Sequence, residues 1–230
     1  AVSAALRVFT EKDTTTDTAL IMIGGDGDNM LTVAPGANAR MTPAHIDKTR
    51  HLLEVSEYVL LQYEIPTDTL YHILEICHET GKKVIFNLAP ASPCDPEHIG
   101  MLHTLVVNEV EASYLSGKPV TTPAETRDAA NILQSMGAEN VIITLGAEGS
   151  YVAAKDFRKK IPAYTVKAVD ATAAGDVYCG TLAVALTEGQ TLEQAVAFAS
   201  ASSAIAVTRM GAQPSAPSRE EIEQMLLRDH

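Results

Sequence analysis

The sequence is poor in cysteine, in basic residues and in long apolar runs. Its three cysteines, Cys77, Cys94 and Cys179, are too few and too irregularly spaced for a disulfide framework or a zinc site, so we expect a reducing compartment. Lys and Arg number 17 against 29 Asp and Glu, which gives a formal net charge of −12. Nucleic acids and acidic membrane surfaces require clustered basic residues. The charge therefore argues against these partners and favours a small molecule with a bound cation.

No apolar run approaches the length of a membrane span, and the N-terminus shows no basic stretch followed by an apolar one. We therefore expect a cytoplasmic protein without a membrane partner. Of the 230 residues, 46% are hydrophobic and 20% are charged, so the chain can bury a substantial core. Without a visible internal repeat or low-complexity linker, it is expected to form one globular domain with a small appendage.

Strand-like runs alternate with helical ones from residue 58 onward, which predicts an α/β fold with a mostly parallel sheet covered by helices. The first strand, at 58–62, is expected to be buried. Capping-box patterns mark helix starts at Thr122, Thr191 and Ser218. Further strands are expected at 84–87, 105–107 and 141–144, and helices at 66–79 and from 122 to near Gly137.

The first 40 residues differ in character. Two strand-like runs, 18–23 and 30–33, flank the Gly- and Asp-rich segment 24–29, which predicts a β-hairpin at the edge of the main sheet or outside it. A Gly-rich segment can also cradle phosphate. Phosphate loops lead into a helix, however, and here a second strand follows, so we favour the turn.

The most informative segment is 170–176, which leads into a helical pattern. The small residues Ala173, Ala174 and Gly175 allow backbone N–H groups to approach an anion at a helix N-terminus, where the helix dipole favours negative charge. Asp176 follows in the first turn. A hydroxyl lying between this carboxylate and a phosphate would have a base on one side and an electrophile on the other. The segment therefore indicates phosphoryl transfer to an alcohol.

A purely structural interpretation explains the same seven residues. Asp170 or Thr172 would cap the helix, and residues 173–175 would pack closely on a strand. On this segment alone the two interpretations are balanced, and other segments have to decide between them.

Polar residues follow several predicted strands, at the ends where open α/β sheets bind their ligands. They are Glu64, Asn87, and Asn108 with Glu111. Each also has a structural interpretation: Glu64 as a solvated turn residue, Asn87 as a turn former, and Asn108 as an N-cap with Glu111 as its capping-box partner. For Asn108 and Glu111 both interpretations can hold.

Two further segments carry possible ligand contacts. The Gly-containing loop 144–149 allows the backbone to pass close to a ligand, although it also fits an ordinary hairpin into a strand at 150–153. Segment 206–215 ends a helix in a polar, irregular stretch. Carbonyl groups freed at a helix end can replace the hydration shell of a cation.

Taken together, these segments resemble the ribokinase family of sugar kinases, which belong to the phosphofructokinase B-type carbohydrate kinases. The motifs stand in family order, and the resemblance extends from near Phe9 to Leu227. It implies a ribokinase-like three-layer α/β/α fold, with part of a small β lid in residues 1–35 and a nucleotide-binding and catalytic domain in residues 36–230. The matching segments are 170–176, Asn108-x-x-Glu111, Thr144-x-Gly146-x-x-Gly149 and 204–215.

The resemblance implies ATP-dependent phosphorylation of the primary 5-hydroxyl of D-ribose. Asp176 would be the general base, and Ala173, Ala174 and Gly175, with the Asp176 N–H, would form an anion hole. Glu64 matches a residue that contacts the sugar. Asn108 and Glu111 would lie near the phosphates and Mg²⁺, through water. The ATP-binding set would further include Thr144, Leu145, Gly146, Ala147, Glu148, Gly149 and Ser200.

The resemblance also implies activation by a monovalent cation, usually K⁺, bound beneath the anion hole. A homodimer formed through the lid is expected for a complete protein of this family. The K⁺ ligands would be the Asp170 side chain, the carbonyl groups of Thr172, Ala206, Arg209 and Gly211, and the Ser215 hydroxyl.

One departure concerns the sugar end of the site. Family members begin with a strand bearing a sugar-binding Asp and a Gly-Gly motif, and too few residues precede Phe9 to supply them, so we expect a chain lacking the N-terminal third. Other pentoses and nucleosides remain alternative substrates. A catalytically inactive nucleotide-binding or dimerisation module is the alternative class. A dehydrogenase is disfavoured because no early Gly-x-Gly-x-x-Gly follows a strand.

Overall fold

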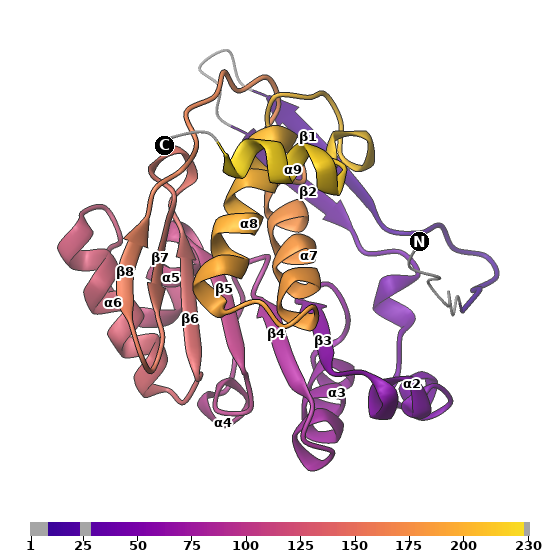
Figure 1. Cartoon of the computed structure of the whole chain (residues 1–230). Helices are drawn as coiled ribbons and strands as arrows, with labels where there is room; N and C mark the ends of the chain where they lie inside the picture. The colour runs from indigo at the N-terminus through magenta and orange to yellow at the C-terminus, as the bar shows by residue number, and fades with distance from the viewer. Residues whose placement is uncertain (1–8, 24–28, 228–230) are drawn as a thin grey trace.

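The computed structural model describes residues 9–23 and 29–227. They contain a six-stranded sheet, the helices that cover it and a separate β-hairpin (Figure 1). The strand order in the main sheet is β3-β4-β5-β6-β7-β8. The first four strands are parallel, and β7 and β8 are antiparallel additions. The strands are β3 (Tyr58–Gln62), β4 (Lys83–Asn87), β5 (Thr104–Asn108), β6 (Asn140–Thr144), β7 (Ser150–Ala153) and β8 (Arg158–Ile161).

The helices cover the two faces of this sheet, and α7 and α8 lie side by side on one of them (Figure 1). The longer helices are α3 (Thr67–Glu79), α5 (Glu109–Ser116), α6 (Pro123–Ser135), α7 (Ala174–Thr187), α8 (Leu192–Ala206) and α9 (Arg219–Leu226). The shorter ones are α1 (Pro43–Asp47), α2 (Arg50–Val55) and α4 (Pro96–Ile99).

Alternate residues of the central strands pack into two separate cores. Phe86 of β4 and Ile143 of β6 pack in the core shared with α3 and α6. Their neighbours Ile85 and Ile142 pack in the core shared with α7 and α8. This arrangement follows from strand geometry, because successive side chains point to opposite faces of a sheet. The predicted three-layer α/β/α fold is confirmed.

The prediction that the strand at 58–62 is buried is wrong for most of its length. Val59 is buried, but Leu60 is 39% exposed. The reason is the position of β3 in the sheet. Within the described residues β3 pairs with β4 alone, so it forms an edge strand.

Four helices begin at capping boxes that the sequence indicates. Asn108 caps α5, and its side chain and that of Glu111 each accept the other's backbone N–H, at 2.9 and 2.8 Å. The capping boxes at Thr122, Thr191 and Ser218 also form and begin α6, α8 and α9. Each box pairs N–H groups that the helix itself leaves without acceptors.

The N-terminal hairpin forms an antiparallel pair, β1 (Thr18–Ile23) with β2 (Asn29–Ala34), as predicted. The predicted Gly- and Asp-rich turn falls on residues 24–28, outside the described residues. The hairpin forms its own two-stranded sheet, separate from the main one.

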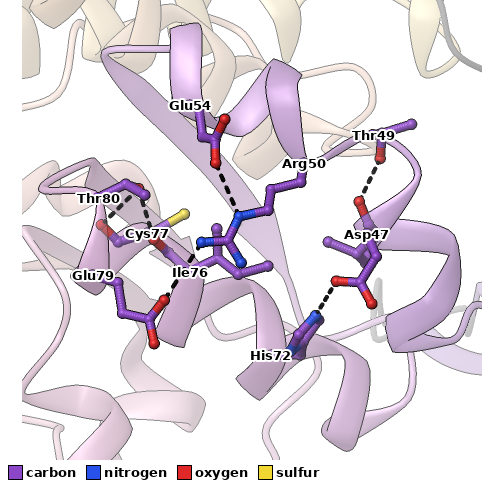
Figure 2. Close-up of polar contacts among 10 residues, drawn as sticks. Asp47, Thr49, Arg50, Glu54, His72, Ile76, Cys77, Glu79 and Thr80 are labelled. Carbon is purple, nitrogen blue, oxygen red and sulfur yellow. Dashed lines mark hydrogen bonds and ion pairs between the residues drawn. The ribbon is translucent and has the colours of Figure 1, made fainter.

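Exposed polar contacts tie the segment before β3 to α3, as Figure 2 shows. Arg50 contacts Glu54 at 2.9 Å and Glu79 at 3.5 Å, and His72 contacts Asp47 at 2.8 Å. Exposed ion pairs contribute little stability individually. The Asp47–His72 contact joins α1 to the middle of α3, and the Arg50–Glu79 contact joins α2 to its C-terminal end. None of the helices in the described ranges combines enough length with enough apolar character to traverse a lipid bilayer.

Candidate active site

The carboxyl ends of the parallel strands and the start of α7 enclose a polar cavity of about 230 Å³. Each strand contributes polar groups as it ends, because its last residues leave the sheet at this edge. The start of α7 closes the opposite side. The lining residues that carry polar side chains are Gln62, Glu64, Asn87, Asn108, Glu111, Thr144, Asp176, Tyr178 and Cys179.

A second and larger cavity, of about 440 Å³, adjoins the first. Its wall is mainly apolar and includes Ala163, Val166, Ala204 and Val207. Both cavities are lined by Thr144, Ala171, Ala174, Gly175 and Tyr178, so the start of α7 forms the boundary between them. The predicted residues that line the larger cavity are Thr144, Gly146, Ala147, Gly149, Ala174, Gly175 and Ser200.

The start of α7 has the geometry of an anion site rather than a capped helix. Ala173 occupies the N-cap position in a left-handed conformation, with φ of 60°, and no side chain caps the helix within the described residues. In the same part of the chain, the backbone N–H groups of Ala173, Gly175 and Asp176 donate to no carbonyl group. The prediction for Ala174 is wrong in this respect, because its N–H donates to the Ala171 carbonyl at 3.2 Å and is not free for an anion. Unpaired donors at a helix N-terminus favour an anion. A left-handed alanine costs about 1–2 kcal/mol, and such strain concentrates at functional sites.

The structural interpretation of this segment is therefore wrong on both counts. Asp170 and Thr172 both precede the N-cap position, and neither side chain caps α7; the Asp170 carboxylate binds other groups. A Cβ built on Gly175 meets no heavy atom of the described chain within 4 Å, so this glycine is not required for close packing. It instead leaves open space beside both cavities.

Asp176 is held by a residue that the sequence analysis missed. The Gln62 Nε2 group donates a hydrogen bond to Asp176 Oδ1 at 2.8 Å, from the end of β3 to the first turn of α7. Glu64 lines the same cavity. Partial burial, with the charges of Asp17 and Asp176, raises the pKa of Glu64. The spacing of Gln62 and Glu64 at a strand end, two residues apart, is the signal that could have identified Gln62.

Asn108 and Glu111 line the polar cavity while also capping α5. The Glu111 side chain is buried, and burial raises its pKa, against the lowering effect of the Asn108 N–H. The capping box uses Oε2 of Glu111 and Oδ1 of Asn108. Their remaining polar atoms can therefore serve a ligand without breaking the cap.

The loop 144–149 forms a tight turn between the antiparallel strands β6 and β7, which confirms the hairpin. Gly149 is required here, because a Cβ at this position would lie 2.1 Å from the Ile161 carbonyl oxygen and its φ is 93°. Leu145 packs against the core, and Glu148 forms an ion pair with Lys160. Neither of these two side chains lines the larger cavity.

Behind the anion site, Asp170 links two distant segments. Its carboxylate accepts the N–H of Thr172 at 2.9 Å and that of Gly211 at 2.8 Å. These hydrogen bonds lower the pKa of Asp170. In the segment after α8, Arg209 forms an ion pair with Glu221, and the buried Ser215 donates its hydroxyl to the Ala212 carbonyl at 2.6 Å.

No cluster of three or more His, Cys, Asp or Glu side chains suited to a metal ion occurs in the described ranges. A cation near this site would therefore draw at most two ligands from these side chains, and the others from backbone, hydroxyl, phosphate or water oxygens. All three cysteines have free thiols, and Cys77 and Cys179 are buried.

A three-layer α/β/α fold with an open helix N-terminus and a carboxylate at the carboxyl edge of its sheet is an arrangement suited to enzymes that transfer phosphoryl groups. Residues 6–219 match the model of the pfkB family of carbohydrate kinases. The chain belongs to this family and is a carbohydrate kinase by descent. The predicted family is confirmed.

Individual relatives show the same relationship. A ribokinase of Staphylococcus aureus (strain COL) is 36% identical over 211 residues, which cover 91% of this chain and 69% of that protein. Among solved structures, ribokinase from Thermotoga maritima has a TM-score of 0.81 and 41% identity, covering 94% of this chain and 71% of that chain. Arabidopsis thaliana ribokinase complexed with ribose and ATP has a TM-score of 0.85 and 28% identity, with the same coverage.

Proposed function

We propose that this chain transfers the γ-phosphoryl group of ATP to the 5-hydroxyl of D-ribose, giving ribose 5-phosphate and ADP. The observation that carries the proposal is the position of Asp176, in a polar cavity directly beside the unpaired N–H groups that begin α7. The similarity to proteins named ribokinase, one of them complexed with ribose and ATP, supports the choice of substrate.

In this proposal Asp176 is the general base. Its carboxylate takes the proton of the 5-hydroxyl as that oxygen forms a bond to the γ-phosphorus, and the bond from phosphorus to the bridging oxygen breaks toward ADP. The N–H groups of Ala173, Gly175 and Asp176 stabilise the charge that develops on the phosphoryl oxygens. Glu64, in the same cavity, would hold the sugar.

The larger cavity suits the nucleoside part of ATP, because it is mainly apolar and opens onto the anion site. Its boundary with the polar cavity would place the phosphates at the start of α7. Gly146, Ala147 and Gly149 would contact the nucleotide, and Ser200 would lie near the base. Leu145 and Glu148 belong to the same loop, but their side chains would fix its position and not contact the nucleotide. Leu145 packs against the core, and Glu148 pairs with Lys160.

Two cations complete the proposal. Asn108 and Glu111 have oxygen atoms suited to water-mediated contact with Mg²⁺, which would neutralise charge on the phosphates when bound. A monovalent cation, K⁺ in the family, would bind near Asp170. The proposed donors are one carboxylate, carbonyl groups and a hydroxyl, a set that suits a hard monovalent ion. They are Asp170, Thr172, Ala206, Arg209, Gly211 and Ser215.

We also propose the division of the chain into a partial lid, 1–35, and a catalytic domain, 36–230. The separate β1-β2 sheet supports it, because the hairpin is not part of the main sheet. A homodimer formed through the lid and a cytoplasmic location remain proposals. Free thiols are consistent with a reducing compartment.

The experiment is a sugar-dependent ADP-release assay on the purified protein with ATP, Mg²⁺ and K⁺. Ribose is compared with 2-deoxyribose, other pentoses and nucleosides, and the product is identified by mass. We expect ribose to give the highest kcat/KM and a product with the mass of ribose 5-phosphate. ATP binding without turnover on any sugar would instead support a nucleotide-binding module and overturn the proposal.

A further inference from the structure

The hydrogen bond between Gln62 and Asp176 joins residues 114 positions apart in the sequence. Among the described residues, no other side chain forms a hydrogen bond with the Asp176 carboxylate. The contact also lies inside the polar cavity, because both residues line it. In the described part of the chain, Gln62 is thus the one side-chain hydrogen-bond partner that restrains the orientation of this carboxylate.

The amide of Gln62 is well placed to restrain it, because the backbone beneath it is fixed. Gln62 is the last residue of β3 and pairs in register with Asn87 of β4. Directly after it, the Tyr63 N–H donates to the Ala89 carbonyl at 3.0 Å, and the Tyr63 hydroxyl donates to the Pro93 carbonyl at 2.9 Å. A side chain that projects from a fixed strand end can hold a partner more accurately than one on a loop.

The chemistry of the two groups fixes which atoms meet. An ionised carboxylate only accepts hydrogen bonds, so the amide nitrogen, not the amide oxygen, must face Asp176. With Oδ1 engaged by this donor, Oδ2 is left to take a proton. The bond to Oδ1 can persist after that transfer, because a protonated carboxyl group still has an acceptor oxygen.

We propose that Gln62 is a positioning residue that orients the Asp176 carboxylate so that Oδ2 faces the sugar hydroxyl. This inference rests on the proposed role of Asp176 as general base. A neutral donor suits the task. Lys or Arg in the same place would hold the carboxylate as well, but a cation would favour its ionised form and weaken it as a proton acceptor.

The main variant is Gln62→Met, which keeps the length of the side chain and removes the donor. We expect kcat to fall about 10- to 100-fold, because a misaligned base lowers the rate of chemistry. The affinity for ATP should change less than about twofold, because the nucleotide cavity is untouched. Gln62→Ala should lose about as much activity as Gln62→Met. If Gln62 served packing alone, Met would preserve activity and only Ala would lose it.

Gln134→Met is the matched control. Gln134 lies on α6, where its amide nitrogen donates to the Glu139 carbonyl at 3.1 Å and its amide oxygen accepts from Arg158, and it lines neither cavity. The chemical change is the same, and kcat should remain at the parent value. Thermal melts of all three variants show whether any loss of activity comes from unfolding.

A second readout does not depend on activity. In a ¹⁵N-labelled protein, the side-chain amide signals of Gln62 should move when Asp176 is changed to Asn, whereas those of Gln134 should not. Unmoved Gln62 signals, or full kcat in Gln62→Met, would overturn the inference while leaving the kinase assignment intact. If the parent protein phosphorylated no sugar, the proposed function and this inference would both be overturned.

Discussion

Asp170 accepts a hydrogen bond from the backbone N–H of Gly211, 41 residues away in the sequence, with 2.8 Å between Oδ2 and the nitrogen. Its other oxygen accepts the N–H of Thr172 at 2.9 Å, just before the anion site. One carboxylate therefore joins the segment before α7 to the segment after α8. Through its bond to Thr172, this link helps to fix the backbone that carries the unpaired N–H groups at the start of α7.

The link predicts a pH-dependent stability. Its hydrogen bonds lower the pKa of Asp170 in the folded protein, so its contribution is present above the unfolded pKa, about 4, and is lost as the pH falls through the lowered folded value. Asp170→Asn should therefore lower Tm most near pH 7, and the difference from the parent should shrink in acid. Melting curves from pH 7 to pH 2 measure it. Asp128→Asn, on the exposed surface of α6, is the control, and an Asp170→Asn offset equal at every pH would contradict the prediction.

Alanine substitutions at two glycines of α7, Gly175 and Gly180, should distinguish an effect on catalysis from an effect on stability. A Cβ at Gly175 or at Gly180 meets no described heavy atom within 4 Å, so Ala fits the fold at both positions. Gly180→Ala should stabilise the helix by about 0.5–1 kcal/mol and leave turnover unchanged. Gly175→Ala should fold equally well but lower kcat about 10-fold or more, because its methyl group projects beside the anion site. Denaturant unfolding and the ADP-release assay measure both. Equal activities in the two variants would argue against an anion hole at Gly175.

The loop between β6 and β7 offers a second matched pair. Gly149→Ala forces a methyl group against the Ile161 carbonyl and should cost about 2–4 kcal/mol of unfolding free energy. Gly146→Ala meets no described atom within 4 Å and should cost about 1 kcal/mol, for its left-handed backbone alone. Urea unfolding of both variants tests the difference. A Gly149→Ala cost no larger than that of Gly146→Ala would show that the loop can shift away from β8.

Sequence patterns predicted the features that depend on neighbouring residues. The capping boxes at Asn108 and Thr122, and the strands β3 to β7, follow from local hydrogen bonding and hydrophobic pattern, and the structure contains them. The strand β8 was not predicted, because its residues Arg158 to Lys160 are charged and exposed. The exposure of Leu60 could not be predicted from neighbouring residues, because it depends on the position of β3 at the edge of the sheet.

The same distinction applies to the site. The strand-end rule predicted that polar residues near Glu64, Asn87 and Asn108 would meet, and they line one cavity. The partner of Asp176 was missed: the strand-end position of Gln62 indicates the cavity, but the contact with Asp176 spans 114 residues of sequence and depends on the tertiary fold. The structural interpretation of Asp170 as a helix cap failed for a similar reason, since its partner Gly211 is distant in sequence.

The most direct test of the account is turnover by Asp176→Asn beside the parent protein, with ATP binding measured on both. Asn has nearly the same shape but cannot take the proton of the sugar hydroxyl. We predict that kcat with ribose falls by about 10²- to 10⁴-fold, while the Kd for ATP changes by less than about twofold. Ribose phosphorylation by Asp176→Asn at the parent rate would contradict the assignment of Asp176 as the base.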